Sequence, residues 1–427
     1  MFSLFLTMSL SRLSTLQLGE LLTMLHVPQS GDTAPLRNTL KEGTITLLKV
    51  LSQDVFRCTL SLFRKANRTP TAEEVLCCTS DTTEEQITIF LRRVIFANNY
   101  RQINCLLGPE KLSYQKNKHF IEEYERLMKN NIHRTPVFFL VVITVETTPS
   151  EIASTYISSH KQFSLSSPQD VRDFTTRILK DDHCSCDPEN LSGRLVKSNA
   201  SGNGKTRKAE LMLDENDREY TFRCIPIHKQ DCDRNVIVKA FLSEIQDAKK
   251  TIYLVDVSPS VFEGADIFIF ELLILKKISD SAGRVFRPFS GDYILVEGLF
   301  TSPDFIRRFP IQFVPFLPVF DCLSPRMSLD IYRTNKQTQS HQILLEHRQF
   351  RSEKWQRVYQ YLSHYKAHEG SMEGFNFTHT EKLEGREHEQ SCIETFLEYI
   401  QIEDPSWREL DNFVKFLNTQ VPAIFTK

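Results

Sequence analysis

The hydrophobic positions of this chain form short unbroken runs that alternate with helical stretches. Such runs lie within residues 73–78, 101–107 and 136–145, and their length and apolar content predict strands. Between them, apolar side chains follow helical spacing after an Asp-Thr-Thr cap at 81–83 and again across 119–131. Strands that are apolar on both faces and alternate with helices predict a parallel sheet covered on both sides.

A second alternation of strands and helices follows a polar stretch. We expect strands at 194–196, 220–227, 251–257 and 293–300, with helices from Lys205, after Asp233 and over 265–278. Beyond about residue 340 the pattern is helical only. The last helix is expected to have Asp404 as its N-cap, followed by Pro405 in the first helical position.

These patterns divide the chain into five parts. In order, they are a helical N-terminal segment (1–68), an α/β subdomain (69–160), a linker (161–192), an AAA+-like P-loop module (193–339) and a helical lid (340–427). The predicted fold class is therefore α/β, with a P-loop NTPase type of parallel sheet flanked by helices, an α/β region before it and a helical lid after it.

Composition excludes several function classes. With 52 Lys and Arg against 54 Asp and Glu, the chain has no basic field to bind nucleic acid. Its ten cysteines are irregularly spaced in a long chain, which favours a reduced, cytoplasmic protein over a disulfide scaffold. No run approaches the ~18 apolar residues of a membrane span, so we expect no transmembrane segment.

The segment "SNASGNGKT" (198–206) predicts a phosphate-binding loop. Gly202, Asn203 and Gly204 let backbone N–H groups approach an anion, and a helix starting at Lys205 directs its positive end toward it. Lys205 adds a mobile positive charge for the outer phosphates, and the hydroxyl of Thr206 is suited to bind Mg²⁺. The alternative is a polar surface turn that contains "GKT" by chance.

The first position of this loop departs from the usual pattern. Asn199 stands where G-x-x-x-x-G-K-[ST] has its first glycine, and after glycine Asn is the residue that best adopts positive φ. The substitution weakens the signal without removing it. We therefore expect ATP with Mg²⁺ to bind at residues 199 and 202–206.

Hydrolysis requires acids beside the loop. The strand "TIYLVDVS" supplies Asp256 on the magnesium side, but the next residue is Val257, where a glutamate would activate the attacking water. Without that general base, a contribution of about 10²–10⁴-fold to the rate is lost. On the sequence alone no other acid is placed beside Asp256, so we expect binding without turnover and name no catalytic residue.

Cysteine and histidine residues suggest no metal centre. The "HCSC" segment (183–186), together with Cys224 and Cys232, has a spacing that matches no standard closed zinc site. No zinc ligand is therefore predicted.

Several longer strings resemble the mysterin family, whose members are giant AAA+ proteins and RING-type ubiquitin ligases. They occur in family order over roughly residues 65–420: "PTAEEVLCCTSDTTEEQITIFLRR" (70–93), "LLGPEKLSY" (106–114), "GNGKT" (202–206), "VFEGADIFIFELLILKKI" (261–278) and "EDPSWRELDNFVKFLNTQ" (403–420). The last string is the most specific and the loop is the least specific.

The resemblance implies a function for the loop. It corresponds to the second AAA module of the family, which holds ATP as a structural ligand while later modules hydrolyse it. Gly204, Lys205 and Thr206 match the end of the family's loop, and Asp256 matches its magnesium-side acid. The implied partners are neighbouring AAA modules of a ring-shaped core and, through the family, the ubiquitin machinery.

Two departures limit what the resemblance implies. Asn199 replaces the first loop glycine of the family. The sequence also contains no Cys/His array resembling a RING, so ubiquitin transfer is not expected of this polypeptide alone. The leading hypothesis is a module that binds ATP and does not hydrolyse it. The alternatives are a scaffold module that has lost the nucleotide and a weak P-loop NTPase.

Overall fold

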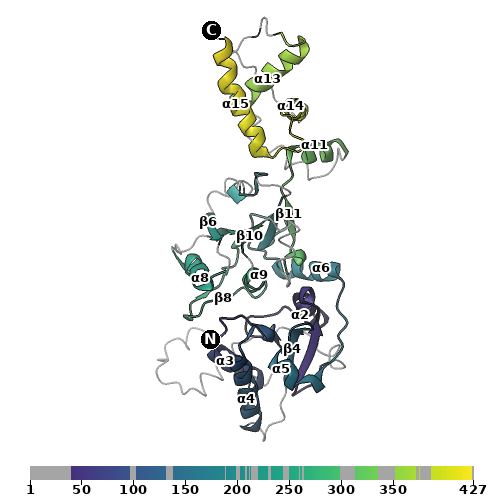
Figure 1. The fold of residues 1–427 in the computed structure, drawn as a ribbon, viewed down its shortest axis with the longest axis vertical. Helices are drawn as coiled ribbons and strands as arrows, with labels where there is room; N and C mark the ends of the chain where they lie inside the picture. Colours follow the sequence, from purple (N-terminus) through teal and green to yellow (C-terminus); the bar gives the residue numbers. More distant parts are fainter. Residues whose placement is uncertain are drawn as a thin grey trace, which may run out of the picture.

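The computed structural model arranges the chain as two α/β units and a helical unit along one long axis (Figure 1). The description below covers residues 40–96, 102–130, 138–187, 189–198, 202–206, 209–210, 212, 220–228, 232–243, 250–258, 260–261, 264–298, 313–334, 352–371, 375 and 386–425. The helical unit lies at one end of this axis, and the second α/β unit lies in the middle (Figure 1).

The first unit is a four-stranded parallel sheet in the order β1-β4-β3-β2. Its strands are β1 (Ile45–Val50), β2 (Val75–Cys77), β3 (Ile103–Leu107) and β4 (Phe139–Val145). Its helical elements are η4 (Ser52–Asp54), α2 (Val55–Lys65), α3 (Glu84–Phe96), η5 (Pro109–Lys111), α4 (Tyr114–Asn130), α5 (Glu151–Thr155) and η6 (Ile157–Ser159). β3 and β4 are buried along their whole length, as their mainly apolar sequences predict.

The prediction that residues 1–68 are helical is wrong at β1. Residues 45–50 pair in parallel with β4 and complete the first sheet. The segment "ITLLKV" is a short apolar run, and such runs do not separate a buried strand from a buried helix by periodicity alone. The helical prediction does hold for α2, and residues 1–39 lie outside the described residues.

The predicted linker at 161–192 contains a packed helix, α6 (Pro168–Leu179). Ser167 caps this helix by accepting a hydrogen bond from the backbone N–H of Asp170. Its apolar face is buried and packs against α2, because Val171, Phe174 and Ile178 recur at helical spacing. Because polar residues surround this helix in the sequence, its apolar periodicity was too weak to predict a helix.

The second unit is a five-stranded parallel sheet in the order β11-β5-β10-β7-β6. Its strands are β5 (Gly193–Lys197), β6 (Tyr220–Ile227), β7 (Lys250–Val257), β10 (Tyr293–Gly298) and β11 (Val319–Asp321). Its helices include α8 (Arg234–Leu242), α9 (Ala265–Leu273) and η7 (Val314–Phe316), and β8 (Ile278–Ser279) and β9 (Val285–Phe286) form an antiparallel pair. Four of its strands repeat the order of the first sheet, which confirms the predicted parallel α/β architecture.

The two α/β units share a hydrophobic core. One continuous cluster of buried residues contains side chains from α2, β3 and β4 of the first unit and from β7, α9 and η7 of the second. At its centre the ring of Phe56 lies 4.9 Å from that of Phe270 and 5.7 Å from that of Phe313, measured between ring centroids. Burial of three aromatic rings in one place joins the units through a large apolar area.

The C-terminal helices have a core of their own. The helices are α11 (Pro325–Thr334), α13 (Glu353–Ala367), α14 (Arg386–Tyr399) and α15 (Trp407–Phe425). Both tryptophans of the chain, Trp355 and Trp407, are buried in this core. α11 lies in the range predicted to belong to the P-loop module, yet its Leu329 packs in the helical core.

α15 begins two residues later than predicted. Ser406, not Asp404, caps the helix: its hydroxyl accepts from the N–H of Glu409, and the Glu409 carboxylate accepts from the N–H of Ser406. This reciprocal pair is a capping box. Asp404 instead accepts a hydrogen bond from the Ser324 hydroxyl at 2.6 Å, which links α15 to the start of α11.

Candidate functional site

The predicted loop lies at a strand-to-helix junction in the second unit. β5 ends at Lys197, the helix begins at Lys205, and β5 lies between β11 and β10 inside the sheet. Gly202 and Gly204 have φ of +87° and +81°, a conformation that residues with a Cβ rarely adopt. Asn199 lies outside the described residues.

Lys205 and Thr206 both contact one carboxylate. The Lys205 Nζ lies 3.7 Å from Oε1 of Glu297, and the Thr206 hydroxyl donates to Oε2 of Glu297 at 3.2 Å. The side chains of Lys205 and Glu297 are only 9% and 13% exposed, so salt screens this pair less than it screens an exposed pair. The two side chains that a phosphate loop directs at its ligand are therefore held by an acid of the same chain.

Asp256 lies beside this acid on the neighbouring strand. β7 and β10 pair in parallel with Asp256 opposite Glu297, near the carboxyl ends of both strands. The side chain of Asp256 is 39% exposed, and its Oδ2 lies 3.4 Å from Nε2 of His228. The next residue, Val257, is buried in the apolar core and supplies no acid.

Glu297 was missed on the sequence, where no acid was assigned beside Asp256. It is the fifth residue of β10, and β10 lies between the strand of the loop and the strand of Asp256. A parallel register brings residues at the same depth of adjacent strands side by side, although here 41 positions separate them in the chain. Finding Glu297 requires the strand order, which the apolar run 293–300 does not reveal.

The environment of Glu297 shifts the pKa of its carboxyl. Burial raises the pKa of this carboxyl above its ordinary value, and the negative charge of Asp256 raises it further. The ammonium of Lys205 and the hydrogen bonds from Lys205 and Thr206 act in the opposite direction. Two carboxylates and one lysine in a partly buried site are a net negative arrangement in which a bound cation is favourable.

The helical unit contacts the loop directly. The backbone N–H of Arg408, in the first turn of α15, donates to the carbonyl of Gly202 at 3.2 Å. A Cβ added to Gly202 would come within 3.0 Å of the Arg408 Cβ and of the Ser406 hydroxyl. The start of α15 therefore lies against the loop, and only glycine leaves room for it.

The same junction in the first unit has no phosphate loop. β1 ends at Val50 and α2 begins at Val55, with the sequence Leu-Ser-Gln-Asp between them. These residues include neither a glycine for close approach nor a lysine for a phosphate. The two units thus share a strand order but differ in the chemistry of their strand-to-helix junctions.

Comparison with known proteins places both units in one family. The "RNF213 AAA domain" family models match residues 46–162 and 189–328. The chain is 29% identical over 411 residues to E3 ubiquitin-protein ligase rnf213-beta of Danio rerio, and 27% identical over 437 residues to E3 ubiquitin-protein ligase RNF213 of Mus musculus. These alignments cover 90% and 93% of this chain.

The chain belongs to the RNF213, or mysterin, family. The human RNF213 is 26% identical over 82% of the chain. The chain spans only 8% of the Danio rerio and Mus musculus proteins. The two AAA matches and the two parallel sheets together confirm the predicted P-loop NTPase type of fold.

The residues of this RNF213-family site fit a magnesium-nucleotide by their chemistry. Two positive-φ glycines shape the loop, and Asn203 contributes a buried side-chain oxygen that has no hydrogen-bond partner among the described residues. Hydroxyl and carboxylate oxygens are the ligands that Mg²⁺ prefers, and one or two carboxylates with substrate phosphates complete such sites. Thr206, Asp256 and Glu297 provide these oxygens near the loop.

The cysteines of the second unit do not gather around a metal. Cys184 and Cys186 contact each other with their sulfur atoms 3.5 Å apart, while Cys224 is exposed on β6 and Cys232 packs next to Gly264. Across the described parts of the chain, no group of three or more His, Cys, Asp or Glu side chains is placed to hold a metal ion.

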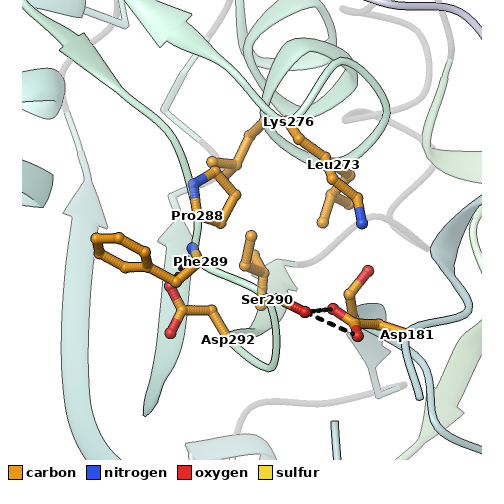
Figure 2. A pocket seen from close by; sticks show the side chains of 10 residues that line it. Asp181, Leu273, Lys276, Pro288, Phe289, Ser290 and Asp292 are labelled. Atoms are coloured by element: carbon orange, nitrogen blue, oxygen red, sulfur yellow. Dashed lines mark hydrogen bonds between the residues drawn. The ribbon is translucent and has the colours of Figure 1, made fainter. Parts of the chain in front are cut away.

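A small cavity lies at the opposite, amino-terminal edge of the second sheet. It has a volume of about 160 Å³, and Figure 2 shows Asp181 and Ser290 pointing toward each other in it. The Asp181 carboxylate already accepts hydrogen bonds from the N–H groups of His183 and Gly291. The cavity is smaller than the ~300 Å³ of a typical ligand pocket, and its polar groups stabilise the loop around it.

Among the described helices, none is both long and apolar enough to cross a membrane.

Proposed function

We propose that the second AAA domain of this chain binds ATP with Mg²⁺ and does not hydrolyse it. The observation that carries the proposal is the junction at 202–206, where two glycines in positive φ lead into a helix that begins with Lys205 and Thr206. Backbone N–H groups at such a helix start favour phosphate, and the lysine side chain is within reach of the same space.

The absence of turnover follows from the position of the acids. A hydrolytic site needs a carboxylate that is free to polarise a water molecule next to the terminal phosphate. The residue after Asp256 is the buried Val257, and Glu297 contacts Lys205 and Thr206. We therefore assign the bound nucleotide a structural role, in which it joins the loop to the start of α15.

This role suits a module of a ring-shaped AAA core. The relatives are named as E3 ubiquitin-protein ligases, and the chain covers only a small part of each. We propose that neighbouring AAA modules are its partners and that any link with the ubiquitin machinery passes through them.

A binding measurement tests the proposal. Isothermal titration of the purified chain with ATP and Mg²⁺ is expected to give saturable binding in the micromolar range or tighter, which Lys205→Ala weakens by at least about tenfold, because a lysine–phosphate ion pair is lost. Lys118→Ala is the matched control, since this lysine is exposed on α4 of the first unit. Binding that survives Lys205→Ala unchanged contradicts the proposal.

Two other functions give different results in the same experiments. The scaffold alternative is favoured by the Glu297 carboxylate, which already neutralises the loop lysine, and it predicts no saturable binding. A weak NTPase is favoured by the position of Glu297 beside Asp256. It predicts steady phosphate release, for which about 1 s⁻¹ is a typical enzyme rate.

A further inference from the structure

Glu297 has a place in the site that the loop sequence does not explain. It lies on β10, between Val196 of the loop strand and Asp256 of β7 in the register of the sheet. Its two oxygens face Lys205 and Thr206, the two side chains that a nucleotide would need. The carboxylate therefore competes with phosphate for the positive charge of the loop.

The charges at this point are unequal. Among the described residues, Lys205 supplies the only Lys or Arg side chain in an ion pair with Glu297. A second acid, Asp256, lies opposite Glu297 on the next strand. Free ATP brings about four negative charges to two carboxylates, and like charges a few ångströms apart in a partly buried site repel strongly. A divalent cation between the carboxylates and the phosphates reverses the sign of this interaction.

We propose that Glu297, together with Asp256, makes nucleotide binding at this site dependent on Mg²⁺. With nucleotide bound, the Lys205 ammonium would pair with the phosphates, and the Glu297 carboxylate and the Thr206 hydroxyl would help to hold the metal ion, which would supply positive charge. The inference rests on the proposed function, because it assigns a selectivity to the same site. In the usual magnesium site of a phosphate loop, the loop hydroxyl acts together with one acid at a strand end. Here a second carboxylate, from the strand between the two, is added.

The test is the ratio of two dissociation constants for ATP, measured by titration with excess Mg²⁺ and with EDTA. For the unaltered chain we expect binding in EDTA to be at least about 100-fold weaker. Glu297→Gln keeps the size of the side chain and removes its charge, so we expect the ratio to fall by about tenfold or more, mainly through tighter binding of free ATP. Glu146→Gln is the control, because Glu146 is an exposed acid that directly follows β4 in the other unit.

The possible results separate the Mg²⁺ dependence from the proposed ATP binding. A ratio that is the same in Glu297→Gln and in the unaltered chain, with both binding ATP, overturns this inference and leaves the proposed function intact. In EDTA, binding of ATP by Glu297→Gln alone supports the competition between Glu297 and phosphate. In Mg²⁺ the same result overturns both proposals, because the unaltered chain would then not bind ATP even with the cation present. No binding by either protein in Mg²⁺ overturns both proposals, provided that circular dichroism and thermal unfolding show that the variant is folded.

Discussion

At the scale of single residues, the acid Asp266 is the least expected feature of the second unit. It lies in the first turn of α9 with its side chain enclosed by the shared core. Its Oδ1 accepts from the N–H of Phe313 at 3.2 Å, but its Oδ2 has no hydrogen-bond partner among the described residues. Burial raises the pKa of Asp266 to about 7, even though hydrogen bonds from backbone N–H groups lower it.

This raised pKa makes the stability of the fold depend on pH. In the unfolded chain Asp266 ionises near its ordinary value of 3.8, so the folded state loses stability as pH rises from about 4 to about 7. Asp266→Asn removes that loss, but it places an amide NH₂ group where the Oδ2 position has no hydrogen-bond partner among the described residues. We expect the variant to be more stable than the unaltered chain by about 2 kcal/mol at pH 8 and no more stable at pH 5.

Urea unfolding at both pH values measures this difference. Asp173→Asn is the control, because Asp173 is exposed on α6. An Asp266→Asn variant that is destabilised equally at pH 5 and pH 8 would show that the carboxylate is ionised and satisfied in the folded protein.

Residues of the candidate site differ in how far the sequence identifies them. Lys205 and Thr206 are found by a local pattern, because a phosphate loop is one continuous segment. Asp256 is found because it ends an apolar strand. Glu297 is not found, since its role depends on which strands are neighbours in the sheet, and nothing within 293–300 states that β10 lies between β5 and β7.

At the scale of elements, the contact between α15 and the loop predicts a coupling between them. Gly202→Ala adds a Cβ that lies 3.0 Å from the Arg408 Cβ, at a φ of +87° that alanine tolerates poorly. We expect the hydrogen bond from the Arg408 N–H to the Gly202 carbonyl to break. Amide exchange at the start of α15 should then accelerate by about tenfold or more, since a strained φ alone costs about 1–3 kcal/mol.

The chain offers a matched control for this experiment. Gly283 has a φ of +80°, and a Cβ added there would meet no atom of the described residues within 4 Å, so Gly283→Ala brings a similar backbone strain without a contact. Hydrogen exchange read by mass spectrometry should show faster exchange in α15 for Gly202→Ala only. Equal effects of the two variants on α15 would mean that the contact with the loop does not hold the helix.

Elements were predicted well where their signal is local and poorly where it is short or masked by polar neighbours. The strands β3 and β4 and the helix α3 follow from long periodic or apolar segments. The sequence pattern predicts helix at β1, because six mainly apolar residues fit either structure until a partner strand is known. The sequence pattern predicts a linker at α6, because only one face of this helix packs against the first unit.

At the scale of the whole molecule, the cores divide the chain differently from the family matches. The two AAA domains share one continuous core, whereas the helical unit has a separate one. Since cooperative unfolding follows the extent of a packed core, we expect the two α/β units to unfold together and the helical unit to unfold as a distinct transition. Both tryptophans lie in the helical unit, so their fluorescence reports its unfolding, while circular dichroism reports the whole chain.

Two phenylalanine substitutions test this division. Phe56→Ala removes the ring between Phe270 and Phe313 and should destabilise the α/β transition by about 3–5 kcal/mol, leaving the fluorescence transition nearly in place. Phe396→Ala removes a buried ring beside Trp355 and should shift the fluorescence transition instead. If either variant moves both transitions by the same amount, the helical unit unfolds together with the AAA domains. The contact between Gly202 and the start of α15 is then strong enough to make the chain one cooperative body.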